Sequence, residues 1–270
     1  MAITRSFDRS AHDLRPVRIE PGPMKFADGS ALIEVGDTRV LAGATLERRV
    51  PPFLVDQNRG WATAEYAMLP RSTPTRSTRE ATRGRPSGRT FEIQRLIGRS
   101  LRSVLALEEM PGFTLILDCD VLQADGGTRT ASITGAYVAA AQALAGALLA
   151  GDLKRWPLRD HLAAVSVGIV DDKLLLDLDA SEDQRAAVDM NVVATGSDNL
   201  VEIQITGEQR SFSRGEFDGL MDLALAGIDT LFVEQQRALE SILGEVRAVE
   251  AKGRRTPAAP RDEKELWGKP

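Results

Sequence analysis

The sequence predicts an α+β protein in which two fused subdomains each consist of strands followed by a helix. Two stretches, residues 17–46 and 162–206, alternate apolar and polar side chains, which is the pattern of half-buried strands. After each of them, apolar residues recur with helical spacing, over residues 90–109 in the first case and beyond Ser213 in the second. The repeated order predicts two halves of comparable build.

The domain limits follow from where these patterns begin and end. We expect one compact domain over residues 1–246, with halves of about 1–150 and 151–246. Beyond Val246 the chain becomes charged and contains prolines, and such segments bury too little apolar surface to fold by themselves. Residues 247–270 are therefore predicted to form a mobile C-terminal tail.

The composition is that of a globular protein outside the membrane. Of the 270 residues 43% are hydrophobic, but no run of 18 or more is apolar, so we expect no membrane span. The first 18 residues lack the apolar middle of a signal peptide. Cys119 is the only cysteine, which excludes an internal disulfide and fits a cytoplasmic protein. A zinc site is not expected, because only His12 and His161 could join that cysteine.

The first half is predicted to contain a hairpin and two helices. Gly36-Asp37 between two apolar runs indicates a tight hairpin turn. Residues 90–109 carry a helical apolar stripe, and a buried strand over 113–117 precedes an alanine-rich helix over 134–150. The other strands of this half are expected at residues 17–20, 31–35, 38–46 and 61–69.

A long polar loop, residues 70–88, separates the fourth strand from the first helix. Loops of this length in compact domains are usually functional or disordered. The net charge of −5 does not by itself suggest a nucleic-acid partner. Between residues 71 and 89, however, the sequence has six arginines and only one acid, Glu80. Such local basicity predicts contact with a phosphate-rich substrate. The arginines are Arg71, Arg76, Arg79, Arg83, Arg85 and Arg89.

A glycine turn leads into the alanine-rich helix. Gly126 and Gly127 stand directly before Thr128 and Arg129. The first turn of a helix has backbone N–H groups without partners and carries the positive end of the helix dipole, which favours a phosphate. Arg129 can add a bidentate contact. A turn of this kind has no phosphate role in most proteins, so the turn alone does not decide the function.

The second half is predicted to contain two hairpins and a long helix. The first hairpin turns at Asp171-Asp172 and the second near Gly196. Ser213 and Glu216 have the spacing of a capping box, which opens the helix. The four strands are expected at residues 162–170, 173–178, 190–194 and 200–206.

Five carboxylates fall within thirteen residues of this half. Carboxylates so close together repel one another unless a cation or an arginine cluster offsets them. One interpretation is a solvated acidic turn between the hairpins. The other is a Mg²⁺ site, because this ion takes oxygen ligands and is often held by one or two carboxylates with water and phosphate. The residues are Asp177, Asp179, Glu182, Asp183 and Asp189.

Several long strings, in order, resemble the ribonuclease PH family, the phosphate-dependent exonucleases that trim RNA 3′ ends. The resemblance covers nearly the whole chain up to about Gly244. The sequence departs from the family's pattern at residues 47–50, which are more basic, and at Ala180-Ser181, where an aromatic residue often stands. Neither departure affects a residue of the implied site. The matching strings are residues 14–17, 36–41, 61–73, 88–99, 118–136 and 177–193.

The resemblance implies a fold of two fused β-then-α subdomains and a site with two parts. In the family, two aspartates six residues apart coordinate the catalytic metal, and carried over to this chain they are Asp177 and Asp183. Asp183 is also a candidate for the general acid at the departing 3′-oxygen. The implied metal is Mg²⁺, with Mn²⁺ as the alternative. The implied phosphate site consists of Arg89, Gly127, Thr128 and Arg129.

The activity implied by the resemblance is phosphorolytic 3′→5′ trimming of tRNA precursors. Inorganic phosphate, the co-substrate, releases nucleoside diphosphates, and the reverse reaction adds nucleotides. Arg89 and Arg129 would act with Asp177 and Asp183 in catalysis. Family members assemble as homohexameric rings, trimers of dimers. The implied RNA-guiding residues are Arg71, Arg76, Arg79 and Arg83.

Two other function classes remain as alternatives. One is a catalytically silent ring subunit that binds RNA as a scaffold, and the carboxylates and arginines of the implied site disfavour it. The other is a small-molecule enzyme that uses the same glycine turn for phosphate. The arginine-rich loop disfavours this second alternative, and a salt-dependent affinity for RNA would exclude it.

Overall fold

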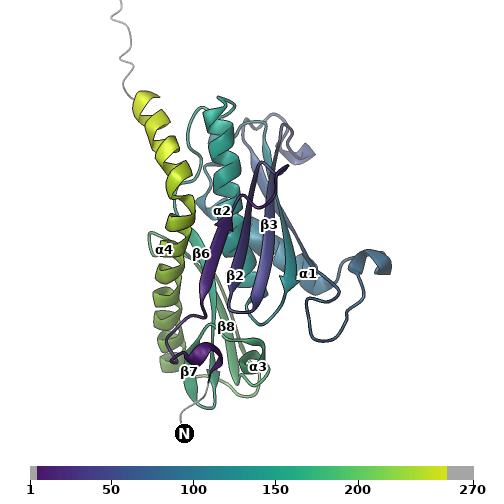
Figure 1. Ribbon diagram of the computed structural model, residues 1–270, viewed down its shortest axis with the longest axis vertical. Helices are drawn as coiled ribbons and strands as arrows, with labels where there is room; N and C mark the ends of the chain where they lie inside the picture. Colours follow the sequence, from purple (N-terminus) through teal and green to yellow (C-terminus); the bar gives the residue numbers. More distant parts are fainter. Residues whose placement is uncertain (1–4, 254–270) are drawn as a thin grey trace, which may run out of the picture.

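The computed structural model describes residues 5–253, which form two sheets with helices between and beside them (Figure 1). The first sheet contains β1 (Val17–Pro21), β2 (Gly29–Val35), β3 (Thr38–Glu47), β4 (Trp61–Met68) and β5 (Thr114–Gln123). The second contains β6 (Leu162–Val170), β7 (Lys173–Leu176), β8 (Val188–Thr195) and β9 (Leu200–Gly207). The helices are α1 (Gly88–Val104), α2 (Thr128–Leu149), α3 (Ala180–Asp183) and α4 (Arg214–Gly253). Short 3-10 turns lie at Ser6–Asp8, Pro52–Leu54, Glu80–Arg83 and Leu107–Glu109.

The two sheets differ in topology. The first has the order β1-β2-β3-β5-β4, and its neighbours run antiparallel except β4 and β5, which are parallel. The second has the order β7-β6-β8-β9 and is antiparallel throughout. The hairpin turn at Gly36 and the turn at Asp171-Asp172 both lie where the sequence predicted them. The predicted α+β arrangement of two strand-then-helix halves is thus confirmed.

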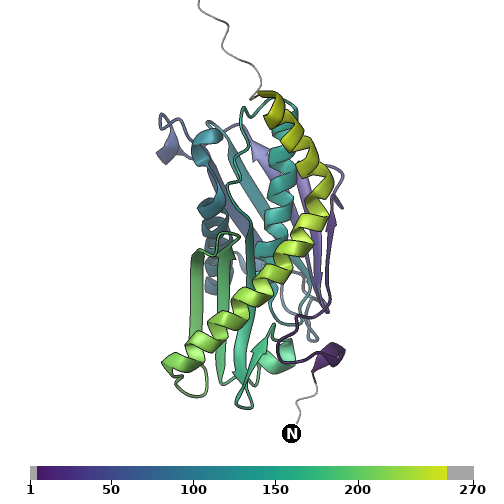
Figure 2. The ribbon, with the colours of Figure 1, turned by 90° about the vertical axis from the view of Figure 1, so that its left-hand side faces the viewer.

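Helix α2 occupies the centre of the molecule. It packs against β2 and β3 on one side and against β6 and α4 on the other, and Figures 1 and 2 show it between the first sheet and α4. Small residues permit this close packing, since a Cβ atom on Gly135 would lie only 2.8 Å from Cγ2 of Ile33. By length and composition α2 could cross a membrane, but 78% of its apolar window is buried inside the protein, as in a core helix.

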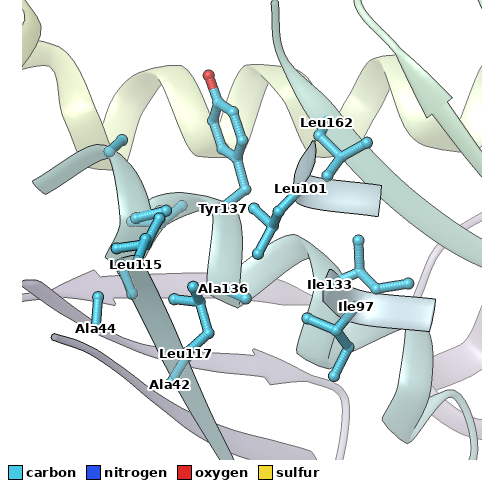
Figure 3. Close-up of a cluster of buried hydrophobic side chains, with 14 of the residues drawn as sticks. Ala42, Ala44, Ile97, Leu101, Leu115, Leu117, Ile133, Ala136, Tyr137 and Leu162 are labelled. Atoms are coloured by element: carbon cyan, nitrogen blue, oxygen red, sulfur yellow. The ribbon is translucent and has the colours of Figure 1, made fainter. Parts of the chain in front are cut away.

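The larger apolar core lies where α1 and α2 cover the first sheet (Figure 3). Ala42 of β3 and Leu117 of β5 supply the sheet side, and Ile97 of α1 and Ile133 of α2 supply the helix side; all four are fully buried. Burial of each large aliphatic side chain stabilises the fold by about 1.5–3 kcal/mol. This core fixes the start of both helices relative to the end of β5.

Several element boundaries differ from the sequence prediction. The helix expected over 90–109 ends at Val104, because Leu105 forms a β-bridge with Leu158 and the next amide bonds to Pro157. The strand expected over 113–117 continues to Gln123, with alternate residues buried. Cys119 lies in that continuation and is buried, as predicted, and burial raises the pKa of its thiol.

Helix α2 begins at Thr128, before the predicted start at residue 134. The hydroxyl groups of its first turns bond to carbonyl oxygens four residues back, Ser132 to Thr128 at 2.8 Å and Thr134 to Thr130 at 3.0 Å. Polar side chains that disfavour a helix by pattern are thus accommodated inside it. The helix therefore follows the glycine turn immediately.

Helix α4 opens with the predicted capping box. The Ser213 amide donates to Glu216 Oε2 at 2.7 Å, and the Glu216 amide donates to Ser213 Oγ at 3.2 Å. The first part of the helix packs on the second sheet, and the last part packs on the core of the first half. In this way α4 joins the two halves along its length (Figure 2).

The predicted tail begins too early. The helix continues past Val246 to Gly253, because Val246 is buried and Val249 packs against the same core. The segment 247–253 therefore belongs to the folded domain. The rest of the predicted tail, residues 254–270, lies outside the described residues.

Leu239 of α4 tests whether the end of this helix belongs to the core of the first half. The side chain is fully buried, so we expect Leu239→Ala to lower the free energy of unfolding by about 2–5 kcal/mol. Val233, on the same helix, is 45% exposed, and Val233→Ala is expected to cost less than about 1 kcal/mol. Urea unfolding followed by circular dichroism measures both. Equal losses would contradict this placement of the helix.

Candidate active site

A cavity of about 880 Å³ opens between the two halves of the molecule. The first half contributes the glycine turn, the start of α2 and Arg89 of α1. The second half contributes the end of α3 and the face of β8 that carries Asp189 and Asn191. Thr73 to Thr75, from the arginine-rich loop, line its rim. Segments far apart in the sequence thus meet around one cavity.

The glycine turn has the geometry that the sequence predicted for an anion site. Gly126 and Gly127 have φ angles of +79° and +65°, a left-handed conformation that favours glycine. Gly127 is the residue before α2, and no side chain caps that end of the helix, so its first amides are free to face a ligand. A Cβ on Gly126 would lie 2.4 Å from the Leu178 carbonyl oxygen, so only glycine fits there.

The residues of the implied phosphate site lie together at this cavity. Arg89, Gly127, Thr128 and Arg129 all line it. The Thr128 hydroxyl accepts a hydrogen bond of 3.0 Å from Tyr66, whose pKa is raised by burial. The Arg129 guanidinium donates to Gln204 Oε1 at 2.8 Å, which holds it beside the cavity from β9. The sequence did not identify Tyr66 or Gln204, because neither belongs to the glycine turn.

Two of the five crowded carboxylates line the cavity, Asp183 and Asp189. Burial, and then the nearby charge of Asp183, raise the pKa of Asp189 to about 6. Asn191 donates to Asp189 Oδ2 at 3.2 Å. No cluster of three or more metal-ligating side chains occurs among the described residues. The two carboxylates of Asp183 and Asp189 would suit an ion that takes its other ligands from water and phosphate.

Asp177 does not line the cavity, and this corrects the predicted metal pair of Asp177 and Asp183. Its carboxylate is buried and gripped by Arg15, with Nε to Oδ2 at 2.9 Å and Nη2 to Oδ1 at 2.7 Å. The Arg15 amide adds a third bond to Oδ2 at 2.8 Å. A carboxylate saturated in this way has a structural role. The family's spacing of six residues fits Asp183 and Asp189 equally well, and spacing alone could not choose between the pairs.

The other acids of the cluster are also paired with arginines of the N-terminal segment. Arg5 bonds Glu182 at 2.7 and 2.9 Å, and Arg9 bonds the same carboxylate at 2.9 Å. Asp179 caps α3, and hydrogen bonds from that helix outweigh its burial and lower its pKa to about 2. The interpretation of a solvated acidic turn is therefore wrong for three of the five acids, since Asp177, Asp179 and Glu182 are buried and offset by arginines.

The arginine-rich loop projects from the body of the molecule beside α1 (Figure 1). Its arginines are exposed where their side chains are described, and Arg71 bonds the Pro74 carbonyl at 2.9 Å. The side chain of Arg83 lies outside the described part of the structure. The loop therefore presents positive charge to solvent next to the rim of the cavity. The exposed arginines are Arg71, Arg76, Arg79 and Arg85.

Sequence comparison connects this arrangement to known proteins. The 3′ exoribonuclease family matches in two parts, domain 1 over residues 13–144 and domain 2 over residues 160–227. A curated relative from Moorella thermoacetica, ribonuclease PH, is 58% identical over 244 residues, which are 90% of this chain and 98% of the relative.

Solved structures with the same fold include subunits of exosomes. An Archaeoglobus fulgidus exosome with RNA bound to its active site has a TM-score of 0.72 at 25% identity, over 85% of this chain and 92% of that one. The crystal structure of rice (Oryza sativa) Rrp46 has a TM-score of 0.69 at 21% identity, over 87% and 100%. The likeness to the rice protein establishes the fold alone.

The different roles of Asp177 and Asp183 can be separated by stability. Asp177→Ala leaves the buried guanidinium of Arg15 without its partner, so we expect a loss of about 3–5 kcal/mol in the free energy of unfolding. Asp183 is exposed, and Asp183→Ala should change stability by less than about 1 kcal/mol. Equilibrium urea unfolding measures both variants. An equally stable Asp177→Ala variant would refute the structural role of Asp177.

Proposed function

The chain belongs to the 3′ exoribonuclease family, and from this premise we propose that the cavity is the active site of a phosphorolytic enzyme. The protein is a phosphate-dependent 3′ exoribonuclease, as its 58% identity to a ribonuclease PH over most of the chain indicates. The observation that supports this site is the meeting of arginines, a free helix N-terminus and two carboxylates around one cavity. The substrate class we propose is the 3′ end of tRNA precursors.

Inorganic phosphate is proposed to bind at the start of α2. The backbone amides after Gly127 and the Thr128 hydroxyl supply hydrogen bonds, and Arg89 and Arg129 supply charge-assisted contacts. A phosphate oxygen attacks the last phosphodiester, the bond to the 3′-oxygen breaks, and that oxygen leaves with a proton. The products are a nucleoside diphosphate and an RNA one nucleotide shorter. Positive charge placed where negative charge develops lowers the barrier.

The metal is proposed to bind at Asp183 and Asp189. The donor chemistry fits, because two carboxylates face the cavity and divalent Mg²⁺ or Mn²⁺ takes such oxygen ligands. The ion would neutralise charge on the scissile phosphate. Asp177 is replaced in this role by Asp189. Asp183 remains the candidate general acid at the departing 3′-oxygen.

RNA is proposed to approach along the arginine-rich loop. Arg71, Arg76 and Arg79 are exposed there and would contact the phosphate backbone, as we also propose for Arg83. Ring assembly as a homohexamer, a trimer of dimers, and a cytoplasmic location are parts of the same proposal. In support, β4 and β9 are edge strands of their sheets and Leu200 of β9 is exposed, which offers surface for neighbouring copies.

The proposed reaction is tested by incubating the protein with a 3′-extended tRNA and Mg²⁺, with and without inorganic phosphate. We expect nucleoside diphosphates, released only when phosphate is present. Nucleoside monophosphates without phosphate would mean hydrolysis and would contradict the phosphate site. RNA binding that weakens steeply with salt, without any release, would identify the silent ring subunit instead.

The metal site is tested by Asp183→Asn and Asp189→Asn. Each removes one anionic ligand, so we expect kcat to fall by at least about 100-fold and the Mg²⁺-induced rise in the melting temperature to shrink. Asp171→Asn, in the exposed turn after β6, is the matched control and should behave as the wild type. Undiminished Mg²⁺ stabilisation in both cavity variants would exclude these two residues as ligands.

A further inference from the structure

Arg15 connects the two walls of the cavity from behind. Its side chain is completely buried, and its guanidinium grips Asp177 with two bonds of 2.7 and 2.9 Å. The same group donates to the carbonyl oxygens of Asp125 and Gly126, the latter at 3.4 Å. One side chain therefore touches both the acidic segment that leads to Asp183 and the glycine turn that leads to Arg129.

The acidic segment has further support of the same kind. Arg5 donates to the Leu176 carbonyl oxygen at 2.7 Å, and Arg9 donates to the Asp177 carbonyl oxygen at 2.5 Å. Both also pair with Glu182. Within the described residues, the contacts of these two arginines do not extend to the glycine turn. The segment thus keeps two anchors when Arg15 is changed.

The glycine turn depends on fewer external contacts. The Thr38 hydroxyl donates to the Gly126 carbonyl oxygen at 2.6 Å and accepts the Asp125 amide at 2.9 Å. Arg15 donates to the Gly126 carbonyl as well and to the Asp125 carbonyl, and a Cβ on Gly127 would lie 3.3 Å from its Nη2. The Ala180 amide adds a bond of 3.4 Å to Asp125 Oδ1. Gly126 and Gly127 could each adopt several backbone conformations, so contacts of this kind are needed to select the left-handed one.

We infer that Arg15, oriented by Asp177, is a positioning residue for inorganic phosphate. It does not line the cavity, yet it holds the 125–127 turn in the conformation that aims the first amides of α2 and Arg129 at one point. Binding groups must be held within about 0.5 Å of their productive positions, so loosening the turn weakens phosphate binding first. The inference rests on the proposed phosphate site.

The effect is expected to be selective for phosphate. The segment that carries Asp183 keeps the bonds of Arg5 and Arg9 to Glu182, and Asp189 is held in β8, so the dependence on Mg²⁺ should not change. The arginine-rich loop makes no hydrogen bond to Arg15 among the described contacts, so RNA affinity should not change either. A general loss of structure would instead alter phosphate binding, Mg²⁺ dependence and RNA affinity together.

The test compares Arg15→Lys with Arg5→Lys in the full-length protein. Both variants replace a buried guanidinium group with a single ammonium group, but only Arg15→Lys loses contacts to the 125–127 turn. For Arg15→Lys we expect the KM for inorganic phosphate to rise about tenfold and the phosphate-induced increase in melting temperature to shrink, with the KM for RNA unchanged. For Arg5→Lys the KM for phosphate should stay within about twofold of the wild type.

A second variant keeps the inference testable if Arg15→Lys does not fold. Asp177→Asn keeps a hydrogen-bond acceptor for Arg15 but removes the negative charge of residue 177. We expect the KM for phosphate to rise about threefold, while the Mg²⁺ concentration for half-saturation stays unchanged. Wild-type phosphate kinetics in the folded variants, or an equal rise in Arg5→Lys, would overturn the inference. Absence of any phosphate effect on the wild type would refute the proposed phosphate site, and the inference with it.

Discussion

The structure depends on a buried set of ion pairs between the N-terminal segment and the acidic segment 177–183, which includes α3. The ion pairs join Arg5, Arg9 and Arg15 to Asp177 and Glu182, and all five side chains are buried. Burying such charges destabilises a protein unless they are paired and hydrogen-bonded. Burial opposes the charge of Arg15, but its bonds to Asp177 and the surrounding acids outweigh that effect and raise its pKa. The requirement for several partners at once gives the N-terminal segment one position.

Helix α2 extends this constraint to the reactive groups. Its N-terminus lies at the turn that Arg15 touches, and its body is buried between the first sheet and α4. The fully buried Gln235 of α4 donates to the carbonyl oxygens of Thr134 and Leu162, at 3.0 and 2.9 Å, and so ties α4 to α2 and β6. A shift of one half against the other would break these bonds, and the cavity between the halves is correspondingly well defined.

The sequence predicted the parts of this architecture that depend on local pattern. The alternation of residues 17–46, the turn at Gly36 and the capping box at Ser213 depend on contacts near in sequence, and the fold confirms them. The glycine turn was located for the same reason. Asp177 was assigned to the wrong role because its partner, Arg15, lies 162 residues away. Repulsion among neighbouring acids was evident from spacing, but the identity of the compensating cation depends on tertiary structure.

The five acids divide into two classes, and this division argues for an active enzyme over a silent subunit. Three acids are buried and paired with arginines, which accounts for their presence by structure alone. Asp183 and Asp189 form no ion pair among the described residues and face the cavity that Arg89 and Arg129 also line. Burial, and then the charge of Asp183, raise the pKa of Asp189, and such a carboxylate destabilises the folded chain unless a cation or a proton offsets it. A catalytically silent scaffold does not need these two carboxylates, whereas a site that binds a divalent cation next to phosphate does.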